Sequence, residues 1–224
     1  MSEHPPRVEI EAVTVTVGRQ RILAPVTATV APGTSLVVRG ENGSGKTTLL
    51  RCVAGMQRPS EGEVRLDGRV VDERSRETRR RVSALLGPSA TYPDLTVYEH
   101  LLLVDASWGG AARTHEERVD LILDGLGIAG LADRFPHELS SGQRHLVDIG
   151  LVLFRPADLL ILDEPEQRLD ADRRRLVAGL LRDRVDEGST MLVATHDPAM
   201  AAAVADAEIT LVAAHVPAGR GTTS

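Results

Sequence analysis

The segment Gly40-Glu41-Asn42-Gly43-Ser44-Gly45-Lys46-Thr47-Thr48 carries the clearest structural signal in this chain of 224 residues. Its glycines allow backbone N–H groups to curl around phosphate oxygens without clashes from Cβ atoms. A short apolar strand at 36–38 leads into it and an apolar helix follows, so the positive end of a helix dipole faces the same loop. This spacing and context are typical of a phosphate-binding P-loop. The alternative is a loop that only resembles one.

The side chains of this loop predict the ligand. In a P-loop, Lys46 would neutralise the charge of the β- and γ-phosphates, and the Thr47 hydroxyl would ligate Mg²⁺. We therefore expect residues 40–48 to bind the phosphates of a nucleotide.

Two acidic residues follow a second apolar run. Residues 159–162 read Leu-Leu-Ile-Leu, as expected of a strand buried on both faces, and Asp163 and Glu164 come directly after it. Ligands of α/β folds bind at the carboxyl ends of strands, so Asp163 can complete the Mg²⁺ shell. Glu164 can then orient or deprotonate a water at the γ-phosphate. Alone, this acidic pair could equally cap a helix; downstream of a P-loop it indicates hydrolysis.

Two more segments are candidates for phosphate contact. Ser140 is placed to cap a helix expected from about residue 142 to 154, within Leu139-Ser140-Ser141-Gly142-Gln143. This segment is either a plain helix start or a second helix N-terminus that offers N–H groups and hydroxyls to phosphate. His196 follows a strand expected at 191–195. A lone histidine is commonly structural, but in a P-loop chain we interpret it as a γ-phosphate contact.

Hydrophobic periodicity predicts an α/β fold. Residues 8–17 alternate apolar and polar with a phase slip near Ala12, which indicates a strand pair or a bulged strand. We expect a P-loop nucleoside-triphosphatase core with a mostly parallel sheet, an N-terminal antiparallel β subdomain and an inserted helical subdomain. Other strands are expected at 22–30, 36–38, 63–68 and 209–212, and amphipathic helices at 119–126 and 176–181. The expected division of this single domain, 1–224, is a core of 1–87 and 151–216, a helical subdomain of 88–150 and a flexible tail of 217–224.

Composition excludes several classes of protein. The 26 Lys+Arg and 32 Asp+Glu give a net charge of −6, which argues against a nucleic-acid partner. The most charged segment, 72–81, is interpreted as a solvated helix face rather than an anion site. The single cysteine, Cys52, excludes an intrachain disulfide framework and a multi-cysteine zinc site. With no apolar run of about 18 residues and no signal-peptide pattern, we expect a cytosolic chain.

These motifs, in this order, resemble the ATP-binding cassette (ABC) family, specifically the nucleotide-binding subunit of ABC transporters, from about Val8 to Val212. Leu139–Gln143 matches the signature motif that separates this family from other P-loop ATPases. Residues 159–164 match the Walker B strand with its catalytic glutamate. Residues 164–170 match the D-loop, which ends at Asp170, and Thr195-His196-Asp197 matches the switch-histidine loop. Residues 92–99 look like the segment after the family's Q-loop.

The resemblance implies an ATPase that uses ATP and Mg²⁺ and works as a head-to-tail dimer. Each ATP would lie between the P-loop of one subunit and the signature segment of the other. ATP would close this dimer and hydrolysis would reopen it. Separate membrane-spanning subunits would receive the motion, so the chain would lie on the cytoplasmic face of a membrane.

Several positions depart from the family pattern. Val17 stands where the family usually stacks an aromatic ring on adenine, with Arg19 and Arg21 as possible substitutes, and the whole chain is only 2% aromatic. Base stacking on a ring is worth about 1–3 kcal/mol, so we expect weaker adenine discrimination. Gly87 stands about where the family has the Q-loop glutamine that contacts Mg²⁺ or its water. We therefore expect an extra Mg²⁺-bound water and slower hydrolysis.

Other departures follow the signature and lie in the D-loop. Leu146 and Leu151 replace two residues that are usually basic, and Asp148 has no explanation in the sequence. The D-loop centre, residues 166–168 (Glu-Gln-Arg), is bulkier and more charged than usual, which predicts an altered dimer contact.

Two alternatives to a transporter ATPase remain open. One is a soluble ABC ATPase without a transport role, although this chain has one cassette and no heptads. The other is a weakly active cassette that serves as the regulatory half of a heterodimer. The implied dimer would join either two identical cassettes or two different ones.

Overall fold

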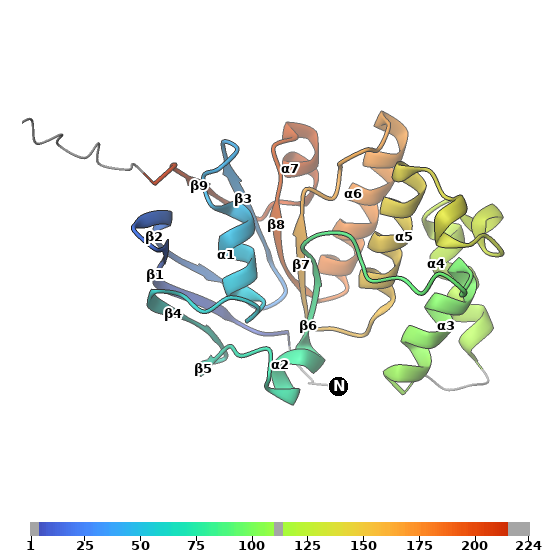
Figure 1. The fold of residues 1–224 in the computed structure, drawn as a ribbon, viewed down its shortest axis with the longest axis horizontal. Coiled ribbons are helices and arrows are strands. Elements are labelled where there is room, and N and C mark those ends of the chain that lie inside the picture. The colour runs from blue at the N-terminus through green and yellow to red at the C-terminus, as the bar shows by residue number, and fades with distance from the viewer. Residues whose placement is uncertain (1–4, 110–113, 215–224) are drawn as a thin grey trace, which may run out of the picture.

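The computed structural model describes residues 5–109 and 114–214, which form two sheets and a group of helices (Figure 1). The strands are β1 (Val8–Val17), β2 (Gln20–Val30), β3 (Ser35–Gly40), β4 (Glu61–Leu66), β5 (Arg69–Val70), β6 (Val82–Leu85), β7 (Leu159–Asp163), β8 (Thr190–Ala194) and β9 (Ala207–Leu211). The helices are α1 (Lys46–Val53), α2 (Arg76–Arg81), α3 (Val97–Ser107), α4 (His115–Gly125), α5 (Ser141–Phe154), α6 (Ala171–Asp186) and α7 (Pro198–Val204), with short 3-10 turns η2 (Ala129–Leu131) and η3 (Pro136–Glu138). The predicted fold class is confirmed. The expected tail, 217–224, lies outside the described residues.

The central sheet is parallel and has the strand order β6-β7-β8-β3-β9. Strand β7 is buried on both faces, since Leu160 and Leu162 pack into the core shared with the helices while Leu159 and Ile161 pack into the core under α1. This two-sided burial is the reason why the strand reads as a continuous apolar run. The sheet delivers Asp163 and the P-loop to the same edge.

The antiparallel sheet, β2-β1-β4-β5, lies on the far side of α1 (Figure 1). The register of β1 slips between Ile10 and Val13, and Ala12 has a positive φ of 47°, so the predicted phase slip is a β-bulge. Strand β2 lies at the edge of this sheet, where a proline such as Pro25 is tolerated. Helix α1 is therefore held between two sheets, which fixes the loop that precedes it.

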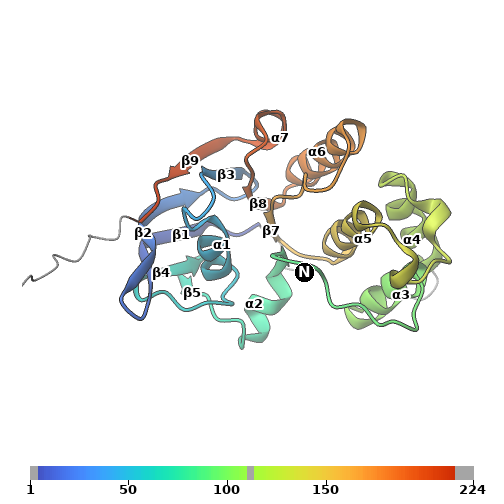
Figure 2. The same ribbon diagram turned by 45° about the horizontal axis from the view of Figure 1, so that its top comes forward.

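Helices α3, α4 and α5 gather away from the antiparallel sheet, next to α6 (Figure 2). Their shared core includes Leu101 of α3, Val119 and Leu123 of α4, and Leu146 of α5. Leu146 is fully buried, so packing requires an apolar residue where the family usually has a basic one. The predicted apolar face of residues 119–126 is confirmed.

Neither strand β6 nor helix α7 was expected from the sequence. Strand β6 is only four residues long and follows the arginine-rich α2, so its apolar signal is short, and its ladder comes from β7, distant in sequence. Helix α7 begins at Pro198 and consists mostly of alanine, which gives no amphipathic period. Both elements depend on long-range packing rather than on a local pattern.

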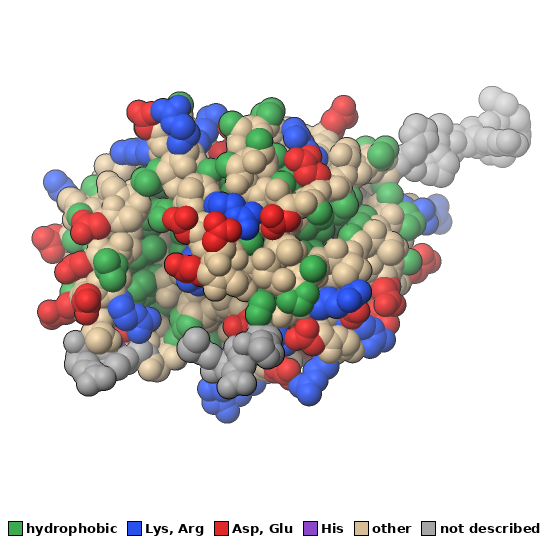
Figure 3. Space-filling model, turned by 180° about the vertical axis from the view of Figure 1, so that it is seen from behind, with side chains coloured by type: hydrophobic (Ala, Val, Ile, Leu, Met, Phe, Trp, Pro, Cys, Tyr) green, Lys and Arg blue, Asp and Glu red, His purple; other side chains and the backbone are tan. Residues whose placement is uncertain are grey.

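Charged side chains of both signs are interspersed on the face seen in Figure 3. Among the described residues several charged side chains are paired; for example, Arg182 of α6 contacts Asp186 at 2.7 Å and Asp206 at 3.0 Å. No helix within residues 5–109 and 114–214 is both long enough and apolar enough to cross a bilayer.

Candidate functional site

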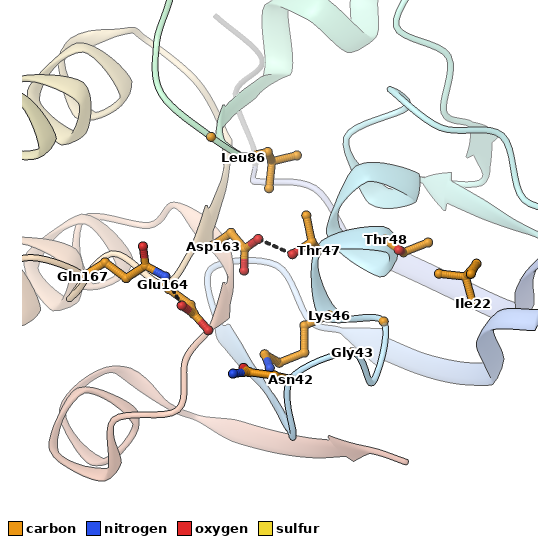
Figure 4. A pocket seen from close by; sticks show the side chains of 12 residues that line it. Ile22, Asn42, Gly43, Lys46, Thr47, Thr48, Leu86, Asp163, Glu164 and Gln167 are labelled. Atoms are coloured by element: carbon orange, nitrogen blue, oxygen red, sulfur yellow. Dashed lines mark hydrogen bonds between the residues drawn. The ribbon is translucent and has the colours of Figure 1, made fainter. Parts of the chain in front are cut away.

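A cavity of about 360 Å³ lies where the P-loop meets the carboxyl end of β7 (Figure 4). It brings together P-loop residues with residues far away in the sequence. Its lining consists of Ile22, Asn42, Gly43, Gly45, Lys46, Thr47, Thr48, Leu86, Gly87, Asp163, Glu164 and Gln167. The sequence-predicted P-loop and acidic pair thus face one space.

The backbone of the P-loop requires glycine at two points. Gly40 has a φ of 148°, and a Cβ atom there would lie 2.7 Å from the Leu211 carbonyl oxygen. Gly45 has a φ of 97°, and its Cβ atom would lie 2.9 Å from the Ile22 carbonyl oxygen. Since L-residues avoid such angles and a side chain would clash, glycine at both positions keeps the tight loop that opens α1.

Lys46 and Ser44 supply polar atoms inside this loop. Lys46 is 6% exposed, and its Nζ donates to the carbonyl oxygens of Gly40 at 2.8 Å and Glu41 at 3.2 Å. The Ser44 hydroxyl is buried and has no hydrogen-bond partner among the described residues. A buried polar atom without a partner is costly, so this loop has donor capacity suited to an anionic ligand.

Thr47 and Asp163 form the pair from which a metal site could be built. The Thr47 hydroxyl donates to Asp163 Oδ2 at 2.5 Å. Burial raises the pKa of the Asp163 carboxyl and Glu164 adds to the rise, while the Thr47 hydrogen bond and Lys46 oppose it. Hydroxyl and carboxylate oxygens are hard ligands of the kind that Mg²⁺ prefers, so the donor set fits the expected ion.

Glu164 and His196 lie together beside this pair. Glu164 adopts a φ of 50°, uncommon for a non-glycine residue, and its N–H donates to the Ala194 carbonyl at 2.8 Å. One oxygen of its carboxylate, Oε1, lies 3.3 Å from His196 Nδ1, and the other, Oε2, accepts a hydrogen bond from the Gln167 amide (Figure 4). Two predicted site residues 32 positions apart in sequence number, Glu164 and His196, are therefore neighbours in space.

The signature segment is not part of this cavity's described lining. Ser140 accepts a hydrogen bond from Gln143 N at 3.3 Å and Gln143 Oε1 accepts from Ser140 N at 2.9 Å, so the two form a capping box at the start of α5. A Cβ atom at Gly142 would lie 2.7 Å from the Arg168 carbonyl oxygen. The segment therefore packs against the D-loop of its own chain. Within one subunit, none of residues 139–143 is among the described residues that line the P-loop cavity.

Asp170, the residue at which the D-loop ends, makes a local structural contact. Its carboxylate caps α6 by accepting a hydrogen bond from Arg173 N at 2.9 Å.

The structure also shows where two residues that depart from the family pattern lie. Val17 is 62% exposed at the end of β1 and does not belong to the cavity's described lining. Gly87 does line the cavity, and a Cβ atom there would meet nothing within 4 Å. The space beside Gly87 is therefore open to solvent or ligand.

Asp148 has a structural explanation that the sequence could not give. It is 4% exposed, and its Oδ1 accepts a hydrogen bond from Ser89 N at 3.3 Å. Burial raises the pKa of this carboxyl, and the Ser89 hydrogen bonds oppose the rise. This hydrogen bond therefore connects α5 to the loop after β6, which also contains Gly87.

Comparisons with known proteins agree with this geometry. The sequence model of the ABC transporter family matches residues 23–167. The Nod factor export ATP-binding protein I of Paraburkholderia xenovorans is 33% identical over 189 residues, or 84% of this chain and 62% of that protein. An Fe(3+) ions import ATP-binding protein of Brucella abortus is 34% identical over 208 residues, or 92% of this chain and 59% of that protein.

A solved structure extends the similarity to three dimensions. It is a dimeric, post-hydrolysis state of an ATP-binding cassette bound to ADP and Pi, with a TM-score of 0.81 and 25% identity, covering 91% of this chain and 94% of the other. The chain spans only 62% and 59% of the length of the two relatives above. The family match covers well over half of the sequence and includes both the P-loop and Asp163. This chain therefore belongs to the ABC transporter family, as one of its ATP-binding cassettes.

Proposed function

We propose that this chain binds ATP with Mg²⁺, hydrolyses it to ADP and phosphate, and drives transport through separate membrane-spanning subunits. The observation that carries the proposal is the convergence of Lys46, the Thr47–Asp163 pair and Glu164 on one cavity of about 360 Å³. Cation, metal-ligand pair and candidate base are the components that phosphoryl transfer to water requires.

In the proposed mechanism, the P-loop backbone and Lys46 bind the phosphates, and the Lys46 ammonium exchanges its carbonyl contacts for phosphate oxygens. Thr47 and Asp163 would hold Mg²⁺, which would supply neutralisation of the phosphate charge. Glu164 orients a water molecule and accepts its proton. His196, which contacts Glu164, donates a hydrogen bond to the γ-phosphate.

The separation of the signature segment from the cavity supports a two-subunit site. We propose that Leu139–Gln143 of one chain faces the P-loop of another, with residues 88–150 as the helical subdomain and 1–87 and 151–216 as the ATP-binding core. The dimeric relative bound to ADP and Pi supports this arrangement. The cassettes would bind the membrane subunits at the cytoplasmic face of the membrane. Of the two relatives named above, one is named for export and the other for import.

The test is ATP hydrolysis by the purified chain, followed as phosphate release with Mg²⁺ present. We expect saturable turnover that the Lys46→Ala variant lacks. Co-expression with a multi-spanning membrane protein encoded beside this chain, and reconstitution in liposomes, should give ATP-dependent movement of solute. ATP turnover without any transport in the reconstituted pair would leave the ATPase proposal standing and overturn the transport proposal.

A second candidate function is favoured by one observation, the missing side chain at Gly87 beside the cavity. It is the regulatory half of a heterodimer that binds ATP and turns it over weakly. Equilibrium ATP binding by the purified chain, with phosphate release that is weak in the homodimer and rises in a mixed dimer with an active cassette, would favour this function over the first.

A further inference from the structure

A buried carboxylate next to the candidate catalytic centre has no role in the mechanism above. Glu166 lies between β7 and α6 and is 2% exposed. Its Oε1 accepts a hydrogen bond from the Thr195 hydroxyl at 2.5 Å, while its Oε2 is buried without a hydrogen-bond partner among the described residues. Burying a carboxylate costs free energy unless charges or donors compensate. The groups around Glu166 therefore show what compensates for its burial.

The nearest group that can carry positive charge is the His196 imidazole. Its Nδ1 lies 3.6 Å from Glu166 Oε1 and 3.3 Å from Glu164 Oε1. Because Gln167 donates to the other oxygen of Glu164, the Glu164 carboxylate is held with Oε1 toward the ring. One edge of the imidazole therefore faces two carboxylates.

Glu166 also fixes the backbone on which His196 sits. The Thr195 hydroxyl that donates to Glu166 accepts a hydrogen bond from Asp197 N at 3.0 Å. These two contacts involve the residues on either side of His196. Glu166 is thus connected to the histidine twice, through the ring and through the loop.

The arrangement has a chemical consequence for the ring. A carboxylate acceptor at Nδ1 stabilises the tautomer with its proton on Nδ1. Such a partner also fixes the orientation of the ring, as the aspartate does in hydrolytic triads. The opposite nitrogen, Nε2, belongs to a side chain that is 63% exposed, and it donates to a phosphate oxygen only when the ring carries a proton on both nitrogens.

We propose that Glu166 is a positioning residue of the ATPase site, holding His196 by Nδ1 so that Nε2 is presented to the terminal phosphate. The proposal rests on the proposed function for its phosphate ligand. Glu166 acts through His196 and does not touch the reacting atoms. Glu166 lies in the D-loop centre, residues 166–168, whose only unusual feature in the sequence is that it is bulkier and more charged than the family pattern.

The first test is spectroscopic and does not need ATP. The ¹⁵N shifts of the His196 ring are recorded in the nucleotide-free protein over a pH series, and the tautomers are compared on the high-pH plateau where the shifts no longer change. The wild type should show mainly the Nδ1–H tautomer. The Glu166→Gln variant has the same shape and can still accept from Thr195, but it lacks the charge, so the Nε2–H tautomer should increase.

The second test is a double-mutant cycle on hydrolysis. Glu166→Gln should lower kcat by about tenfold, the effect of losing roughly one charge-assisted hydrogen bond, with KM for ATP changed less than about twofold, as expected for an interaction made mainly in the transition state. In a His196→Ala background the same substitution should have no further effect on kcat. Melting temperatures of all variants show whether each one is folded.

The outcomes separate the two proposals. An unchanged tautomer ratio in Glu166→Gln, or an equal loss of kcat with and without His196, would overturn the positioning role. A wild-type protein that hydrolyses no ATP would contradict the proposed function, and the tautomer measurement would still decide whether Glu166 controls His196.

Discussion

Gly87 offers the sharpest single perturbation, because it lines the cavity yet has no side chain. A Cβ atom at this position meets nothing within 4 Å, but φ is 141°, an angle that L-residues rarely adopt. Any side chain should therefore cost backbone strain of about 2 kcal/mol, which for a chain of this size lowers Tm by about 4–8 °C. Gly87→Gln and Gly87→Ala share this cost, and the glutamine adds one methylene and the amide beyond the Cβ atom.

The comparison between the two variants isolates the amide. A charge-assisted hydrogen bond contributes about 1.5 kcal/mol, so a glutamine that contacts Mg²⁺ or its water should raise kcat about tenfold over the alanine variant. Steady-state phosphate release gives kcat, and differential scanning calorimetry gives the two Tm values. Equal kcat in the two variants would refute the expectation that the missing glutamine slows hydrolysis. A Tm as high as that of the wild type would refute the strain.

Two further substitutions test local packing. Gly142→Ala places a Cβ atom 2.7 Å from the Arg168 carbonyl oxygen and should lower Tm through about 1–3 kcal/mol of overpacking. Gly179→Ala in α6 meets nothing within 4 Å and should leave Tm unchanged or raise it. A Tm for Gly142→Ala no lower than that for Gly179→Ala would contradict the D-loop contact. Burial raises the pKa of Asp148, so the folded state disfavours its charge and stability falls as pH rises through that raised pKa. Asp148→Asn keeps an acceptor for Ser89 but carries no charge. Its Tm should therefore be higher than that of the wild type at about pH 7 and the same at about pH 3. Thermal melts at both pH values that show no such difference would refute this.

The parts of the site that could be predicted from the sequence are those that depend on local spacing. The P-loop places Lys46 and Thr47 at the start of α1 by its own backbone geometry. Strand β7 is a continuous apolar run, so its carboxyl end, and with it Asp163, could be located in advance. The contact between Thr47 and Asp163 at 2.5 Å follows from these two local features once the strands lie in one parallel sheet.

The parts that could not be predicted depend on partners far along the chain. Asp148 contacts Ser89 across 59 positions, and no pattern in α5 indicates where its carboxylate will lie. Glu166 was noted as an unusual charge in the D-loop, but its burial depends on Thr195, which comes from the end of β8. Strand β6 was missed for the same reason, since a run from Val82 to Leu85 is too short to be recognised without its neighbour β7.

The tertiary structure also changes the meaning of the departures from the family pattern. Leu146 is explained by packing alone, because it is buried in the core of the helical group. Gly87 differs, since its open surroundings and positive φ allow no inexpensive return to a glutamine.

Hydrolysis at Glu164 is the central claim, and the Glu164→Gln variant tests it most directly. The measurement is phosphate release per chain at saturating ATP and Mg²⁺, made together with ATP affinity. We predict that turnover collapses by at least about a hundredfold, as expected for loss of a general base, while ATP affinity is retained and an ATP-bound dimer accumulates. Turnover equal to that of the wild type would contradict the assignment of Glu164 and with it the proposed mechanism.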